Sequence, residues 1–128
     1  MRAKFSMSDQ IILLIEDDQT LRFLAKRQFE RLGVTCDTAA NGLEGVEMSK
    51  KGYAMIIMDI SMPEMNGIEA TYQIREFEKS EGKERTPIIG LSAFSTNEDC
   101  VAAGMDDFMQ KPMMLEQAKE MLAKYLKK

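Results

Sequence analysis

The sequence predicts one α/β domain, a doubly wound parallel sheet of five strands with helices on both faces. Short apolar runs alternate with segments in which apolar residues recur at helical spacing, and the connections between them are short. This alternation favours right-handed βα units, whose strands lie parallel. The 128 residues are enough for one domain with its own core.

The first expected strand is the apolar run from Ile11 to Ile15. After it, apolar residues recur at the spacing of one helical face: Leu21, Leu24, Ala25, Phe29 and Leu32. Gly33 is expected to end this helix as its C-terminal cap. Residues 1–9 show no period, so we expect a flexible lead-in there and a domain over residues 10–128.

A shorter, more polar second strand is expected from Val34 to Ala39. Asn41-Gly42 should then begin a helix that ends at Gly52 and has an apolar face containing Leu43 and Val46. The third strand, from Tyr53 to Asp59, is apolar without alternation, as expected of a central strand in a parallel sheet.

The third helix is marked by Ile68, Thr71, Ile74 and Phe77. The charged segment 79–85 is expected to form an exposed loop after it. Pro87 opens a fourth strand, Ile88 to Leu91, which ends in Ser92-Ala93.

Ser95 and Glu98 have the spacing of a capping box for the fourth helix. A short fifth strand is expected within residues 105–110, before Lys111-Pro112. The last helix carries an apolar stripe: Leu115, Ala118, Leu122 and Leu126.

Composition excludes several classes of function. The net charge of -4 argues against direct nucleic-acid binding, and no apolar run approaches the ~20 residues of a spanning helix, so we expect a cytosolic domain without membrane contact. The chain has no histidine, and its two cysteines, Cys36 and Cys100, are expected to be reduced packing residues. The usual zinc and Cys-His catalytic patterns are therefore ruled out.

The polar residues of interest all follow strands. Glu16 and Asp17 come after the first strand, Asp59 ends the third, Ser92 follows the fourth and Lys111 follows the fifth. Because ligand sites of doubly wound sheets lie outside the carboxyl ends of the strands, these five residues should share one edge. Asp18, one position beyond the acidic pair, is expected to cap a helix.

Three carboxylates at one edge repel one another, by about 4 kcal/mol for two charges ~4 Å apart at a dielectric of ~20. Either one of them takes up a proton or a hard divalent cation binds, and oxygen ligands alone favour Mg²⁺. Such an ion would shield a phosphoryl group while Asp59 attacks phosphorus. Lys111 and Ser92 would then hold the phosphoryl oxygens.

Four motifs in this order resemble the receiver domains of two-component response regulators: Leu14-Ile15-Glu16-Asp17, Met58-Asp59-Ile60-Ser61-Met62-Pro63-Glu64-Met65-Asn66-Gly67, Leu91-Ser92-Ala93 and Lys111-Pro112. The resemblance covers nearly the whole chain. It implies a flavodoxin-like (βα)5 fold with strand order 2-1-3-4-5 and a phosphoacceptor at Asp59. It also implies that Asp17 binds the metal directly and Glu16 through water, with the backbone carbonyl of Ser61 completing the set.

The same resemblance makes Phe108 the switch aromatic and a phosphohistidine the phosphodonor, on a histidine kinase or a histidine phosphotransfer protein. As an isolated domain it would catalyse only its own phosphorylation and dephosphorylation. Segments 68–71, 85–87 and 103–107 resemble receivers of hybrid sensor histidine kinases, so the parent chain is expected to be one. Two alternatives stay open: an aspartyl-phosphate phosphatase, which would need a second acid where Ser61 stands, and a pseudo-receiver scaffold.

Overall fold

Five strands alternate with five helices in the part of the chain that the computed structural model describes: residues 10–62, 65–93 and 98–126, apart from the side chain of Asp99. The strands are β1 (Ile11–Ile15), β2 (Thr35–Ala39), β3 (Met55–Asp59), β4 (Ile88–Ser92) and β5 (Asp107–Gln110). The helices are α1 (Gln19–Arg31), α2 (Gly42–Ser49), α3 (Gly67–Glu81), α4 (Glu98–Ala103) and α5 (Leu115–Tyr125).

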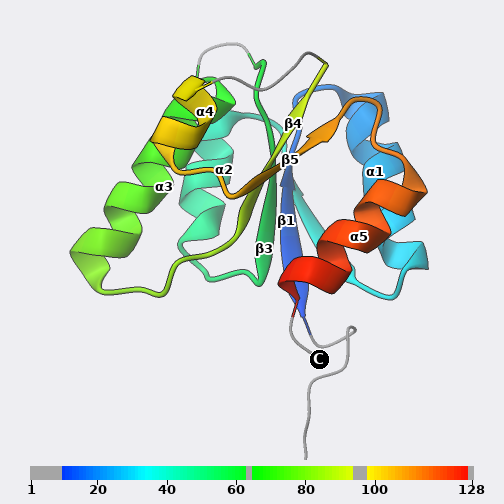
Figure 1. Cartoon of the computed structure of the whole chain (residues 1–128), viewed down its shortest axis with the longest axis horizontal. Helices are drawn as coiled ribbons and strands as arrows, with labels where there is room; N and C mark the ends of the chain where they lie inside the picture. Colours follow the sequence, from blue (N-terminus) through cyan, green and yellow to red (C-terminus); the bar gives the residue numbers. More distant parts are fainter. Residues whose placement is uncertain (1–9, 63–64, 94–97, 127–128) are drawn as a thin grey trace, which may run out of the picture.

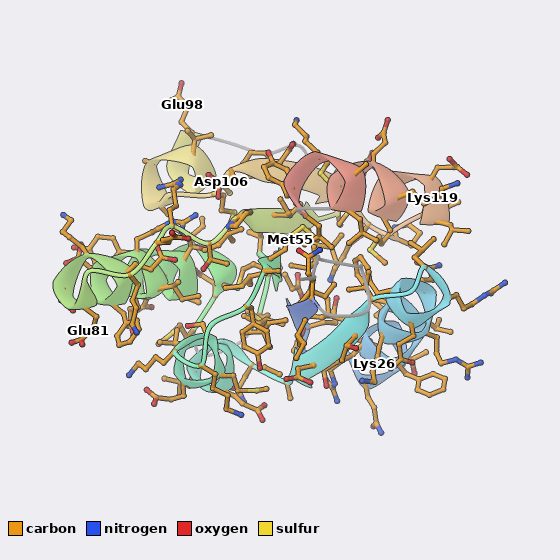
Figure 2. The ribbon with its side chains drawn as sticks, turned by 90° about the horizontal axis from the view of Figure 1, so that it is seen from below. Lys26, Met55, Glu81, Glu98, Asp106 and Lys119 are labelled. Atoms are coloured by element: carbon orange, nitrogen blue, oxygen red, sulfur yellow. The ribbon has the colours of Figure 1, made fainter. Side chains whose placement is uncertain are left out.

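All strand pairs are parallel, and the order across the sheet is β2-β1-β3-β4-β5, as the sequence predicts. Helices α1 and α5 cover one face, and α2, α3 and α4 cover the other (Figure 1). Figure 2 gives an end-on view, with Met55 of β3 in the middle, Lys26 and Lys119 on the α1 and α5 side, and Glu81 on the opposite side. None of the described helices is long and apolar enough to cross a membrane.

The sheet separates two apolar cores because successive residues of a strand point to opposite faces. Ile12 and Leu14 of β1 pack with Phe29 of α1 and Leu122 of α5 on one face. Leu13 and Ile15 pack on the other, in a cluster that includes residues of α2 and α3. Both cysteines are buried thiols, one in each core. Burial raises the pKa of the Cys36 thiol to about 12, so it stays protonated.

Two glycines allow the close approaches that shape the carboxyl edge of the sheet. A Cβ at Gly67, the first residue of α3, would lie 2.3 Å from the carbonyl oxygen of Asp59. A Cβ at Gly42, the first residue of α2, would lie 2.4 Å from the carbonyl oxygen of Met65. Both contacts are with backbone, which cannot move aside, and they bring the two helix starts against the loop after β3.

Several expected boundaries differ from the structure. Helix α3 continues through residues 79–81 of the charged segment and ends at Gly82, which takes a left-handed conformation at φ 64°. Strand β2 begins at Thr35 rather than Val34, and Ser92 is the last residue of β4 rather than a residue after it. Gly33 follows the C-cap Leu32 with φ 90°, which confirms that a glycine ends α1.

The apolar faces of two helices also differ from expectation. Leu43 was expected on the core side of α2 but is 54% exposed, because Gly42 and Gly45 occupy the buried side. Leu24 of α1 is 51% exposed. The flexible lead-in expected for residues 1–9 and the Ser95 half of the capping box lie outside the described residues.

Candidate functional site

Three carboxylates meet at the carboxyl edge of the sheet, where β1 and β3 lie side by side. Ile15 pairs with Met58, so Glu16 and Asp59 are the next residues of two neighbouring strands. Glu16, Asp17 and Asp59 each offer a carboxylate oxygen within 4.8 Å of the other two. Glu16 and Asp59 are buried, and Asp17 is exposed at the rim. The predicted gathering of these acids is therefore present in the structure.

Lys111 enters this cluster from the turn after β5. Its Nζ lies 3.1 Å from Oδ1 of Asp59 and 3.3 Å from Oε1 of Glu16. Its backbone N–H donates to the carbonyl of Ser92 at 2.7 Å, which ties this turn to the end of β4. The Lys111-Pro112 peptide bond is cis. One ammonium thus contacts two of the three carboxylates.

The two oxygens of Asp59 differ in their surroundings. Oδ1 accepts a hydrogen bond from the backbone N–H of Ser61 at 3.2 Å and is also the oxygen that faces Lys111. Oδ2 is buried and has no hydrogen-bond partner among the residues that the structure describes. A buried oxygen without a partner is unfavourable by about 1–3 kcal/mol, and more if it carries charge. Of the two oxygens of Asp59, Oδ2 would therefore gain more from a bound cation or a new bond.

Burial raises the pKa of Asp59 to about 7, and the neighbouring Glu16 carboxylate adds to the rise while Lys111 opposes it. Burial would lower the pKa of Lys111, but its contacts with Asp59 and Glu16 outweigh burial and raise it. Both shifts include the effect of an excess of negative charge, to which burial adds at Asp59 and which burial opposes at Lys111. A divalent cation would remove that excess, because it stabilises the ionised carboxylates.

The loop between β1 and α1 is held by its own side chains. Oε2 of Glu16 accepts a hydrogen bond from the N–H of Asp18 at 3.1 Å. Oδ1 of Asp18 accepts from the N–H of Leu21 at 2.9 Å, so Asp18 is the N-cap of α1, as expected. The side chain of Arg22 donates back to the carbonyls of Glu16 and Asp17. This folded turn fixes where the two acids point.

Ser92 and Phe108 lie on the neighbouring strands. Leu91 pairs with Asp59, so Ser92 is one residue further along the edge, and it is buried. Phe108 pairs with Gly90, where a Cβ would come 2.9 Å from the Phe108 ring. Phe108 is partly buried and packs against the core beneath α2 and α3. Its ring thus occupies space that any side chain at position 90 would take.

Two cavities lie at opposite ends of the sheet. One of about 230 Å³ is lined by Glu16, Lys111 and the apolar residues Leu24 and Met113. Another of about 490 Å³ lies at the amino ends of the strands, between Tyr53 and Phe77. Although the second is larger, the carboxylate cluster lies beside the first, together with the raised pKa values of Asp59 and Lys111, and we place the site there.

A family model described as a response regulator receiver domain matches residues 12–123. The chain belongs to this family. It is the receiver domain of a two-component phosphorelay, which confirms the resemblance found in the sequence.

Receiver domains in longer proteins are among its relatives. Hybrid signal transduction histidine kinase F of Dictyostelium discoideum is 44% identical over 120 residues, which cover 90% of this chain. The chain spans only 11% of the length of that protein. The receiver domain of the Arabidopsis thaliana histidine kinase CKI1, in a structure complexed with Mg²⁺, is 30% identical with a TM-score of 0.82, covering 91% of each chain.

A third comparison concerns a co-crystal structure from Saccharomyces cerevisiae of the histidine phosphotransfer protein Ypd1 and the receiver domain of the response regulator Ssk1. It matches with a TM-score of 0.85 and 26% identity, covering 91% of this chain and 88% of that one. These likenesses confirm the flavodoxin-like receiver fold.

The structure also shows what the sequence did not reveal about this receiver. Arg22 contacts the acidic loop, yet an arginine in the first turns of a helix resembles any solvent-facing residue in the sequence. Arg75 of α3 binds Glu78, Asp106 and the carbonyl of Gly104, and only the tertiary structure brings these together. Ser61 reaches the acid cluster through its backbone, a contact that does not depend on its side chain.

Proposed function

We propose that this receiver domain takes a phosphoryl group from a phosphohistidine onto Asp59. The observation that carries the proposal is the surroundings of Asp59: a fully buried carboxylate, flanked by two acids and one lysine, whose Oδ2 has no hydrogen-bond partner within the described part of the chain. A structural acid would have its hydrogen bonds filled, since nearly all buried polar groups do. A carboxylate oxygen at the edge of the sheet that lacks a hydrogen-bond partner is available to bind a cation or to attack phosphorus.

In this reaction an oxygen of Asp59 forms a bond to phosphorus and the bond between phosphorus and the imidazole nitrogen breaks. The electron pair of that bond stays on the nitrogen, which regains a proton from water. Lys111 is close enough to Asp59 to pair with a phosphoryl oxygen, and we assign Ser92 as a hydroxyl donor to another. Fixed groups of this kind stabilise charge that develops in the transition state.

We further assign Glu16, Asp17, Asp59 and the carbonyl of Ser61 as the groups that hold Mg²⁺, with Glu16 acting through water. The cluster fits a hard cation because its donors are oxygens, its net charge is negative and one buried oxygen is unsatisfied. When bound, Mg²⁺ supplies shielding between the carboxylates and the phosphoryl oxygens. The related CKI1 receiver was solved with Mg²⁺, which supports the choice of metal.

The phosphodonor must lie outside this sequence, because the chain contains no histidine. We propose a histidine phosphotransfer protein or the kinase core of a longer hybrid histidine kinase as the donor. The co-crystal of Ypd1 with an Ssk1 receiver and the hybrid kinases among the relatives support both options. On the same ground we propose a cytoplasmic site of action and no enzymatic activity beyond the domain's own phosphorylation and dephosphorylation.

Phe108 is proposed as the switch residue. Phosphorylation would draw Ser92 toward Asp59, and Phe108 would move into the vacated space, displacing the surface of α4, β5 and α5. Gly90 allows the ring to lie directly against β4, because a Cβ at that position would lie 2.9 Å from the ring. NMR signals of Phe108 should differ between the free protein and its beryllofluoride complex. Identical signals in the two states would refute the switch role of Phe108.

The phosphoacceptor is tested by incubating the protein with acetyl phosphate and Mg²⁺ and measuring its intact mass. We expect a gain of one phosphoryl group in the wild type and in the control Asp107→Asn, and no gain in Asp59→Asn. Asp107 of β5 is a suitable control because its carboxylate binds Lys124 and Tyr125 of α5. Turnover of many phosphate esters would favour the phosphatase alternative, and no labelling would favour the scaffold. The exposed Ser61, where a phosphatase needs an acid, argues against the first.

A further inference from the structure

Arg22, in the first turns of α1, reaches back to the acidic loop. Its Nη1 donates to the backbone carbonyl of Glu16 at 2.7 Å and lies 3.4 Å from the carbonyl of Asp17. The backbone N–H of the same residue donates to the carbonyl of Asp18 at 2.8 Å. A single residue therefore contacts three consecutive carbonyls at the end of β1.

These contacts fix the part of the backbone from which the metal-binding side chains project. The N–H of Glu16 is held on the other side by the carbonyl of Ala39, at 3.1 Å. Between that bond and Arg22, the Glu16 peptide groups have little freedom to rotate. Because Asp17 is exposed at the rim, packing around its side chain does little to fix its direction. Its direction depends on the backbone.

Arg22 differs from Lys111 in what it leaves available. Lys111 faces carboxylate oxygens of Glu16 and Asp59, the same oxygens that a cation would use. Among the described residues, Arg22 forms no ion pair within 4.0 Å, and both loop contacts of its guanidinium are with carbonyls. Its positive charge sits beside the acidic loop without occupying a ligand atom. Such a group orders a metal site without competing for it.

We propose that Arg22 is a positioning residue for the divalent-cation site of this receiver domain. It acts through the Glu16 and Asp17 carbonyls and holds the two carboxylates in the arrangement that binds Mg²⁺. The inference rests on the proposed function, in which these acids bind the metal. Loss of residues that orient metal ligands typically weakens metal affinity about 10–100-fold, and we expect a loss near the lower end because Arg22 is only partly buried.

The test is calorimetric titration of the whole chain with MgCl₂ for the wild type, Arg22→Gln, Arg22→Lys and Arg27→Gln. Arg27 is the matched control: it lies on the same helix, is exposed and stacks on Phe23. We expect Arg22→Gln to raise the Mg²⁺ Kd about 10-fold. Arg22→Lys should recover part of that loss, because it keeps a cation and a donor. Arg27→Gln should bind as the wild type does.

Thermal unfolding in excess EDTA separates positioning from a purely structural role. We expect the metal-free unfolding temperature of Arg22→Gln to change little while its Mg²⁺ affinity falls. A Kd of Arg22→Gln within twofold of the wild type overturns the proposal, and so does an equal loss of affinity in Arg27→Gln, which would show that the contacts of Arg22 with the loop carbonyls are not the cause. If Arg22→Gln does not fold, the intermediate affinity expected of Arg22→Lys decides. A wild type that binds no Mg²⁺ would instead refute the proposed metal site itself.

Discussion

Asp59 should make the metal-free receiver less stable as the pH rises. Its pKa is about 7 in the folded protein against 3.8 ordinarily, so between these values the folded state holds a proton that the unfolded state has lost. Stability from this group is fully present below the unfolded pKa and is lost as the pH rises through about 7. The difference of about three pKa units corresponds to roughly 4 kcal/mol, at ~1.4 kcal/mol per unit.

Asp59→Asn removes this titration. We expect the variant to unfold with nearly the wild-type free energy at pH 4 and to be more stable at pH 8, by up to about 4 kcal/mol. Roughly 3 kcal/mol of that gap should open between pH 5 and pH 8. Urea unfolding followed by far-UV circular dichroism in EDTA measures it. Adding Mg²⁺ at pH 8 should narrow the gap, because ligand binding stabilises the folded wild type.

Asp107→Asn is the control with the opposite sign. Hydrogen bonds from Lys124, Phe108 and Tyr125 outweigh burial and lower the pKa of Asp107. Its contribution is present above its unfolded pKa and lost as the pH falls, so Asp107→Asn should be destabilising at pH 8. If Asp59→Asn is no more stable than the wild type at pH 8, the carboxylate is already neutralised by its neighbours and the reasoning about excess charge is wrong.

Three further outcomes are expected. Gly67→Ala should destabilise the fold by about 1–3 kcal/mol and weaken Mg²⁺ binding, since its Cβ would meet the carbonyl oxygen of Asp59. Urea unfolding measures the stability and titration calorimetry measures the Mg²⁺ affinity. Unchanged values would show that the turn after β3 does not need a glycine at this position. Lys111→Met should remove the ammonium that Asp59 and Glu16 share and slow labelling by acetyl phosphate, and labelling at the wild-type rate would remove Lys111 from the mechanism. Arg75→Met should cost about 3–5 kcal/mol because it removes the arginine paired with the buried Glu78 and one of the two arginines that bind the partly buried Asp106, whereas the exposed Arg85→Met should cost under about 1 kcal/mol; equal urea midpoints would refute the difference.

The sheet and its polar edge were predictable because both follow from local patterns and one topological rule. Continuous apolar runs identify central strands, and parallel strands place their carboxyl ends together. Glu16, Asp59 and Lys111 therefore come within contact distance, although up to 95 positions separate them along the chain. Four short motifs in a fixed order were then enough to identify the family.

The direction of single side chains was not predictable in the same way. Leu43 has the spacing of a core residue, but the close contact of Gly42 with the Met65 backbone turns α2 so that the glycines face inward. The charged residues 79–81 look like a loop, yet α3 continues until Gly82 supplies a left-handed residue. The contacts of Arg22 are with backbone carbonyls, which every residue has, so the sequence of the partner residues does not reveal them.

The division of the interior by the sheet has a consequence for how this domain can vary. Among the described residues, no side chain belongs to both apolar cores. A substitution in the core beneath α1 or α5 therefore alters the packing of the core beneath α2 and α3 only by moving the backbone of the strands. One flank can accumulate new residues and acquire a different binding preference while the packing of the opposite flank is kept.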